Sequence, residues 1–366
     1  MKIYVVGGAI RDQLLGLPVK DVDYVVVGSS PEEMIKKGFK PVGQDFPVFL
    51  HPDTNQEYAL ARTERKVAPG YKGFTFHANP DVTLEQDLER RDLTVNAMAQ
   101  EISEDGKVIG LIIDPYGGVK DIEKNVLRHV GPAFSEDPVR LLRVARFSAR
   151  FPSFTVAPET ITLLQGMGLS GELKALVKER VWQEFSKGLM SEQPSKMFHV
   201  LESCQVFEQF FPAELLGVTS VLKNLDIAAQ QKLNISQRCA VLLASLKSEL
   251  IKDWATQWGI PGECKDYAVL ASDLTQTLRG AKLSSIDVLD LLDRVDVWRK
   301  PDRFTELMTV IKILGYKTDQ LSESYMAARQ IDVGQIAAAV TSSGAKSGEL
   351  IKDAIRLARL AVIKEL

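Results

Sequence analysis

The feature that most constrains the fold of this chain is a change of pattern near Val126. Before that residue, short runs rich in β-branched residues, KIYVV (2–6) and DYVVVG (23–28), alternate with helical patterns such as AIRDQLLG (9–16). After it, amphipathic helical patterns follow one another to the end of the chain, with prolines and glycines between them. The sequence therefore predicts an α+β protein, in which a mixed-sheet head precedes an all-helical remainder.

Further elements fit this division. Strands are expected at residues 47–52, 57–63 and 107–118, and helices at residues 30–38 and in the residues after Arg90. A chain of 366 residues is too long for one average domain. We expect three: a catalytic head at 1–125, a helical neck at 126–215, and a helical body and tail at 216–366.

The composition excludes some classes of protein. The formal net charge of −3 argues against a protein that coats nucleic acid non-specifically, although a local basic surface is compatible with it. Three widely spaced cysteines follow no metal-binding pattern and are typical of buried thiols in a reducing compartment. The apolar start, MKIYVVGG, is too short for a signal peptide, and no apolar run reaches the length of a membrane span. We expect a cytoplasmic protein.

Two glycines stand between the first predicted strand and the first predicted helix. Gly7 and Gly8 allow a ligand to approach the backbone closely, and a helix N-terminus favours phosphate. Arg11, one turn further on, could face the same anion. A plain strand-to-helix turn would account for these residues equally well.

A pair of aspartates opens the second strand. Asp21 and Asp23 are two residues apart, so their side chains project from one face. Adjacent carboxylates repel each other unless a cation lies between them, and Mg²⁺ prefers such oxygen ligands, often shared with substrate phosphates. An ordinary polar turn before an edge strand is the alternative. Glu57, at the start of another strand, is a candidate third acid. Together these residues outline a nucleotidyltransferase, whose metals serve the attacking hydroxyl and the leaving pyrophosphate.

A helix rich in arginine is predicted at residues 135–151, SEDPVRLLRVARFSARF. At 100° per residue, its four arginines fall within an arc of about 120°, and a carboxylate pair, Glu136 and Asp137, precedes them. The arginines are Arg140, Arg143, Arg146 and Arg150. Like charges on one face repel, so the face needs either solvent or a partner.

These motifs, in this order, resemble one family. GGAIRD, DVDYVVVG, ARTERK, RRDLTVNAMA (90–99), DPYGGVKDI (114–122) and EDPVRLLRVARF (136–147) are similar to the motifs of bacterial class II CCA-adding enzymes. These tRNA nucleotidyltransferases are closely related in sequence to poly(A) polymerases. The resemblance covers roughly residues 1–189.

The resemblance implies roles for individual residues. Asp21 and Asp23 would be Mg²⁺ ligands, with Glu57 as a third acid; Gly8, Arg11 and Arg91 would contact the triphosphate. Asp92 and Asn96 match positions near the ribose, where a hydrogen bond to the 2′-hydroxyl favours ribonucleotides. The positions that read the incoming base in place of a template are Asp137, Arg140, Arg143 and Arg146.

The amino groups of cytosine and adenine each lie beside a ring-nitrogen acceptor, so a carboxylate and a guanidinium complement either edge. Uracil and guanine present a carbonyl where Asp137 needs a donor. Two structural alternatives remain open at this stage. Asp137 before Pro138 is also a good N-cap, and the arginine face could be merely solvated.

Two segments favour CCA addition over poly(A) synthesis. Related poly(A) polymerases carry a Gly-Arg-Arg-Phe-Arg stretch where this chain reads VGQDFPVF (42–49), with Gln44 and Asp45 in place of the arginine pair. The segment at residues 66–80 resembles the mobile loop of enzymes that add the terminal A as well as both Cs. A poly(A) polymerase, a partial CC- or A-adding enzyme, and an inactive RNA-binding protein are the rival interpretations.

The C-terminal half differs from that of the longest relatives. Those carry a His-Asp phosphohydrolase domain, whereas no histidine follows His199 in this chain, so that activity is not expected here. The partners that the resemblance implies are the tRNA 3′ end, CTP and ATP, with neither DNA nor a membrane. Basic residues of the C-terminal helices would hold the tRNA by its phosphates, with Lys352, Arg356 and Arg359 on adjacent turns.

Overall fold

The computed structural model describes residues 1–42, 48–66, 74–103, 105–279, 283–342 and 348–366. These form two compact units, Met1–Phe211 and Pro212–Leu366. The expected boundary at 215/216 lies close to the division between the units, and the expected boundary at residue 125 lies inside the first unit. The three-part division remains a prediction. Gln44, Asp45 and residues 67–73 of the expected mobile loop lie outside the described residues.

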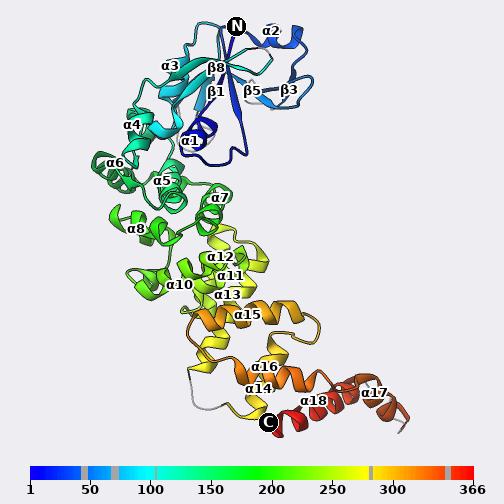
Figure 1. Cartoon of the computed structure of the whole chain (residues 1–366). Helices are drawn as coiled ribbons and strands as arrows, with labels where there is room; N and C mark the ends of the chain where they lie inside the picture. The colour runs from blue at the N-terminus through cyan, green and yellow to red at the C-terminus, as the bar shows by residue number, and fades with distance from the viewer. Residues whose placement is uncertain (43–47, 67–73, 104, 280–282, 343–347) are drawn as a thin grey trace. The chain divides into compact units, whose positions relative to one another are not determined.

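A mixed sheet of seven strands forms the start of the first unit, in the order β3-β4-β5-β2-β1-β8-β9 (Figure 1). Only the β2–β5 pair is parallel. The strands are β1 Lys2–Val6, β2 Asp23–Val27, β3 Lys40–Val42, β4 Val48–Leu50, β5 Glu57–Leu60, β8 Ala99–Ile102 and β9 Val108–Ile113. A separate hairpin joins β6 Thr63–Lys66 to β7 Phe74–His77. The expected mixed sheet is thereby confirmed.

Side chains that alternate between the two faces of the sheet form two hydrophobic cores, one on each face. Ile3 packs on one face with Val26 and with Met34 of α2 (Pro31–Lys36). Its neighbour Tyr4 packs on the other face with Val25 and with Leu88 of α3 (Leu84–Glu89). Because successive strand residues point to opposite faces, this alternation fixes the register of the central strands.

Register also brings the glycine turn to the aspartate pair. The last residue of β1, Val6, pairs with the first residue of β2, Asp23. Gly7 and Gly8 follow directly, and α1 (Gly8–Leu14) begins there. The sheet therefore holds the predicted phosphate-binding turn beside one of the predicted acids.

The expected helix after Arg90 is wrong. Between Arg90 and strand β8, the structure forms only one 3₁₀ turn, η2 (Thr94–Asn96). Leu93 is extended and forms an isolated antiparallel bridge with His129, and Thr94 N–H donates to the Arg128 carbonyl. Pairing with a distant segment thus outweighs a weak local helical pattern that contains β-branched Thr94 and Val95.

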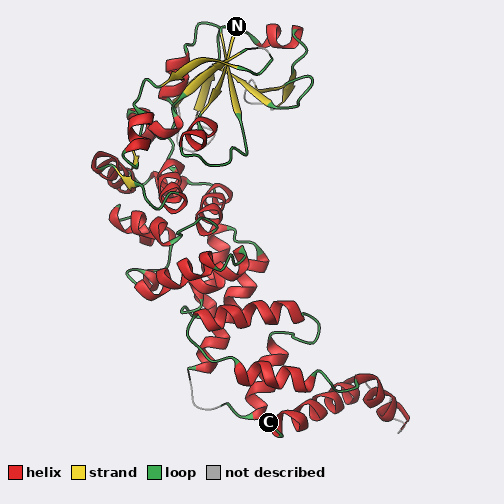
Figure 2. Cartoon of the chain, viewed as in Figure 1, coloured by secondary structure: helices red, strands yellow, loops and turns green. Residues whose placement is uncertain are grey.

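The rest of the first unit is mainly helical, as Figure 2 shows. Helix α5 (Val139–Arg150) packs on α7 (Lys178–Leu189) and α8 (Ser195–Ser203). The other elements are α4 Gly118–Glu123, β10 Val126–Leu127, η3 Pro132–Glu136, β11 Thr155–Val156, α6 Pro158–Leu169, η4 Glu172–Ala175 and α9 Phe207–Phe210. The β10 and β11 pair is a short parallel exception within the helical region.

The second unit contains helices alone among its described residues. They are η5 Ala213–Leu215, α10 Thr219–Gln230, α11 Ile235–Leu243, α12 Ser248–Trp258, α13 Gly262–Leu278, α14 Ser285–Arg294, α15 Pro301–Ile313, α16 Asp319–Ala328, α17 Val333–Ser342 and α18 Gly348–Lys364. No helix in the described part of the chain has both the length and the apolar character of a membrane span.

Two of the basic residues expected to hold tRNA have partners within the second unit. Arg356 of α18 forms ion pairs with Asp290 and Asp293 of α14. Arg359 stacks over the ring of Trp298, with 3.5 Å between its guanidinium carbon and the ring centroid. Both side chains therefore attach α18 to its neighbours. Lys352, one turn earlier, is exposed.

Gly118 is expected to be intolerant of any side chain. A Cβ at this position would collide with the Thr94 carbonyl and approach Met98 Cγ to 3.0 Å. We expect Gly118→Ala to lower the free energy of unfolding of the first unit by about 1–3 kcal/mol through overpacking. Gly166→Ala is the control, because that helical glycine has no atom within 4 Å of the added Cβ. It should be neutral or slightly stabilising. Urea unfolding of both variants measures the difference, and equal midpoints would contradict the expected collision.

Candidate functional site

A polar cavity of about 370 Å³ lies between the glycine turn, the start of β2, the segment after α3, and helices α5 and α7. Eight predicted site residues line it: Gly8, Arg11, Asp23, Arg91, Asp92, Asp137, Arg140 and Arg143. Asn96, which matches a position near the ribose, also lines it. Segments far apart in the sequence thus meet at one place. Asp21, Glu57 and Arg146 are not among the lining residues.

The charge of the cavity indicates the kind of ligand that it takes. Six arginines and three aspartates line it. The excess of guanidinium groups favours a polyanion, and forked donors suit phosphate oxygens in particular. Two of these arginines, Arg90 and Arg180, were not among the site residues predicted from the sequence. A volume near 370 Å³ lies within the range of small-ligand sites.

The glycine turn lines the cavity with its backbone, because Gly7 and Gly8 have no side chains. Gly7 has a φ of +69°, in the left-handed region that favours glycine. A Cβ there would lie 2.8 Å from Nη1 of Arg91 and 3.3 Å from the Asn96 carbonyl oxygen. A side chain at this position would therefore displace an arginine that lines the cavity. Gly7 was noted from the sequence as part of the turn, and its close contact with Arg91 is what the structure adds.

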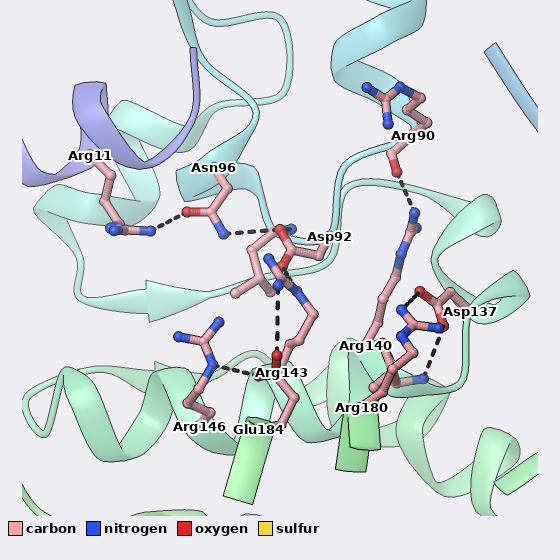
Figure 3. A network of polar contacts seen from close by, with 12 residues as sticks. Arg11, Arg90, Asp92, Asn96, Asp137, Arg140, Arg143, Arg146, Arg180 and Glu184 are labelled. Carbon is pink, nitrogen blue, oxygen red and sulfur yellow. Dashed lines mark hydrogen bonds and ion pairs between the residues drawn. The ribbon is translucent and has the colours of Figure 1, made fainter. Parts of the chain in front are cut away.

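Asp92 is the centre of a buried hydrogen-bond network (Figure 3). Its Oδ1 accepts from Asn96 Nδ2 at 2.9 Å and from the Leu93 N–H at 2.8 Å, and its Oδ2 accepts from Arg143 Nε at 2.7 Å. Burial alone raises the pKa of Asp92, but the charge of Arg143 and these hydrogen bonds outweigh it and hold the pKa well below its ordinary value. Asp92 is therefore an anion that holds Arg143 in place.

Arg11 has protein partners close to where a phosphate contact was expected. Its guanidinium donates to Asn96 Oδ1, and to Asp12 Oδ1 at 2.9 and 2.7 Å. The side chain is buried against the rings of Phe147 and Phe151, at 5.3 and 5.1 Å from their centroids. Burial lowers the pKa of Arg11, and Asp12 partly opposes that shift. Arg11 lines the cavity, but these contacts also give it a structural role.

The arginine face of α5 is not merely solvated. Arg143 pairs with Asp92, Arg146 with Glu184 of α7, and Arg150 with Asp12 of α1. Arg140 donates to the carbonyl oxygens of Ala133 and Arg90, at 3.1 and 2.5 Å. Each arginine has a partner from another segment, and three of these partners are carboxylates that offset the mutual repulsion expected from the sequence.

Asp137 is held by a residue that was not predicted from the sequence. Arg180 of α7 forms a two-pronged ion pair with its carboxylate, Nη1 to Oδ1 at 3.3 Å and Nη2 to Oδ2 at 2.8 Å (Figure 3). Oδ1 also accepts from the Val139 N–H at 3.2 Å. Helix α5 itself starts after Pro138 without a side-chain cap. The N-cap alternative is therefore only partly right. Oδ1 thus accepts two hydrogen bonds and Oδ2 one, so Oδ2 keeps one lone pair with which to accept from a ligand.

The acids at the strand starts fit a divalent cation in their chemistry. Asp21 and Asp23 are exposed, and neither forms an ion pair with the described residues. Asp23 lies at a cavity suited to phosphate, where a hard cation shared with phosphate oxygens would be held. Glu57 starts the parallel neighbour of β2. Within the described residues, no three potential ligand side chains form a metal site on their own. The role of Glu57 remains a prediction.

A glycine turn, an aspartate pair at a strand start and an arginine-lined cavity define this molecule as a nucleotidyltransferase of the type that works with a divalent metal. The profile of the family described as "Poly A polymerase head domain" matches residues 3–128. A second, "Probable RNA and SrmB- binding site of polymerase A", matches residues 153–214.

Relatives that align over nearly their whole length show to which family of nucleotidyltransferases the chain belongs. The chain is 45% identical to the "Multifunctional CCA protein" of Burkholderia pseudomallei strain 1106a over 411 aligned residues, which cover 100% of this chain and 98% of the relative. The protein of the same name from Burkholderia multivorans is also 45% identical, over 99% of this chain and 98% of the relative. The chain belongs to this family of CCA proteins, and the family resemblance seen in the sequence motifs is confirmed.

Solved structures agree on the fold. The CCA-adding enzyme of Bacillus stearothermophilus in complex with CTP matches with a TM-score of 0.67 at 23% identity, over 99% of this chain and 89% of that one. A structure titled as a CCA-adding enzyme complex with ATP matches with a TM-score of 0.68 at 22% identity, over 99% and 86%. At these identities the likeness concerns the fold of the chain.

Proposed function

We propose that this protein adds the sequence CCA to the 3′ end of tRNA without a template, using CTP and ATP. The observation that carries the proposal is that Asp23, Asp137 and Arg140 line the same cavity. A group suited to hold a metal and groups suited to read a base are thereby within reach of one nucleoside triphosphate. The names of the relatives, and the CTP and ATP complexes of similar folds, support it.

Base selection is assigned to the carboxylate of Asp137 and the guanidinium of Arg140. The carboxylate accepts from the exocyclic amino group of cytosine or adenine, and the guanidinium donates to the adjacent ring nitrogen. Arg180 holds the carboxylate in a fixed orientation through two hydrogen bonds. Uracil and guanine would bring a carbonyl oxygen against that half-buried anion, at the place where the amino group of cytosine or adenine donates a hydrogen bond.

The phosphate end of the nucleotide is assigned to the glycine turn and the arginines around it. Gly8 offers backbone, and Arg91 lies 2.8 Å from the position of a Cβ on Gly7. Asp92 and Asn96 are bound to each other at the position expected for the ribose. These residues bind and orient the triphosphate for attack by the tRNA hydroxyl at the α-phosphate, and pyrophosphate leaves.

The cofactor that we propose is Mg²⁺, held by Asp21 and Asp23. When bound, it would lower the pKa of the attacking hydroxyl and neutralise charge on the leaving phosphates. The carboxylates of both residues are exposed, so substrate phosphates can complete the coordination. Since the substrate is tRNA, the expected compartment remains the cytoplasm.

The phosphohydrolase activity of longer relatives is not part of the proposal. The alignment with the Burkholderia pseudomallei protein is longer than this chain, so that protein has residues without a counterpart here. The last histidine of the chain is His199, which is exposed and near Glu202. The proposed activity is nucleotidyl transfer alone.

The test is an end-group assay with tRNA transcripts that end before CCA, after C, or after CC, each incubated with Mg²⁺ and single nucleotides. We expect two C residues from CTP on the first transcript and one A from ATP only on the transcript ending in CC. Long tails from ATP alone would establish a poly(A) polymerase instead. Addition of C without A would indicate a partial enzyme, and no incorporation with normal tRNA binding an inactive RNA-binding protein.

A further inference from the structure

Six side chains form a continuous series of polar contacts that begins and ends on α5. Arg143 contacts Asp92, Asp92 contacts Asn96, and Asn96 contacts Arg11. Arg11 contacts Asp12, and Asp12 contacts Arg150, seven residues after Arg143 on the same helix. The series passes through η2 and α1. It therefore joins the helix with the base-reading residues to the helix that follows the glycine turn.

Asp12 is the shared member of this series. Its Oδ1 accepts from Arg11 Nη2 at 2.7 Å, and its Oδ2 accepts from Arg150 Nη2 at 2.8 Å. The carboxylate is largely buried, with 10% of its side chain exposed. Neither Asp12 nor Arg150 lines the cavity. They cannot read a base directly, so any effect on base choice must pass through the position of α5.

Aromatic contacts reinforce the same junction. The guanidinium carbon of Arg11 lies 5.3 Å from the Phe147 ring centroid and 5.1 Å from that of Phe151. The guanidinium carbon of Arg150 lies 5.0 Å from the Phe151 ring centroid. Both phenylalanines are buried. The C-terminal half of α5 is thus attached to α1 by charge and by packing together.

We propose that Asp12 and Arg150 are positioning residues for base selection, which hold α5 at a fixed distance from the glycine turn. The inference rests on the proposed reading role of Asp137 and Arg140. Ten residues of helix separate Arg140 from Arg150, or about 15 Å of rise. A tilt of about 5° at the far end would move the reading end by about 1.3 Å, enough to break a hydrogen bond.

The test compares Arg150→Met with Arg128→Met. Arg128 is a matched control: its side chain is 37% exposed against 39% for Arg150, and it pairs with a buried carboxylate, Asp121, at 3.1 Å. It does not line the cavity. Single-nucleotide incorporation into tRNA lacking CCA gives kcat/KM for CTP and for UTP, and thermal unfolding gives Tm. Arg150→Met should lower the CTP over UTP ratio about tenfold, while Arg128→Met should lower Tm comparably without changing the ratio.

Arg150→Lys keeps the charge and should recover part of the ratio; it also replaces Arg150→Met if that variant does not fold. An unchanged ratio in both Arg150 variants, or an equal loss in Arg128→Met, would overturn the inference. Arg140→Ala in the same assay separates the positioning role of Arg150 from the base-reading role of Arg140. If it relaxes selection while the Arg150 variants do not, only the positioning role fails. If none of the three variants relaxes selection, the reading role fails as well.

Discussion

Asp23→Asn is expected to reduce nucleotide incorporation at least about a thousandfold, because it removes a negative oxygen ligand from the proposed metal site. The carboxylate is exposed and has no ion pair among the described residues. The nearly isosteric amide should therefore change the free energy of unfolding by less than about 0.5 kcal/mol. Single-turnover incorporation of CTP, together with filter binding of tRNA, separates a loss of chemistry from a loss of binding.

Three comparisons sharpen this expectation. Asp81→Asn is the control, since Asp81 is an exposed aspartate of the same unit away from the cavity, and it should retain full activity. Asp21→Asn should also inactivate the enzyme if both acids hold the metal. Glu57→Gln tests the predicted third acid: a loss like that of Asp21→Asn would support the role, and full activity would exclude it. Substantial activity in Asp23→Asn, or lost tRNA binding as the cause, would contradict the assignment.

Structural features that depend only on residues close together in the sequence could be predicted. The α+β division, the strand–glycine–helix turn and the Asp-x-Asp strand each depend on a few consecutive residues with a characteristic spacing. The strand register then brings Asp23 to the end of β1. Most of the residues that line the cavity were named by the resemblance of these motifs to a known family, and not by local spacing alone.

Features that depend on distant partners could not be predicted. Arg180 is 43 residues from Asp137, and Arg150 is 138 residues from Asp12. The one available signal was the spacing of Arg180 and Glu184, which places both on one face of α7 toward α5. Spacing alone does not choose between solvent and a buried partner. The helix expected after Arg90 was wrong for the same reason, because pairing with a distant segment decided the local structure.

Arg146 shows where a sequence motif and the geometry diverge. The motif placed it with the base-reading arginines, yet it does not line the cavity and instead pairs with Glu184, over the ring of Phe147. Burial lowers the pKa of Arg146, and Glu184 partly offsets that shift. A base-reading role for this residue remains a prediction from the sequence, and it can be tested beside Arg140.

Arg140→Ala is expected to lower the ratio of kcat/KM for CTP over UTP about a hundredfold, because selection by a buried polar pair is lost when one partner is removed. Arg146→Ala is the matched comparison: both arginines are 9% exposed and both belong to α5. Since Arg146 lies outside the cavity, its loss should reduce stability while leaving the ratio within about twofold. Incorporation of each nucleotide on tRNA lacking CCA measures the ratio, and inhibition by pyrophosphate reports the phosphate end, which Arg140→Ala should affect little. An unchanged ratio in Arg140→Ala would remove the basis for base reading by α5, whereas equal losses in both variants would extend the reading surface to Arg146.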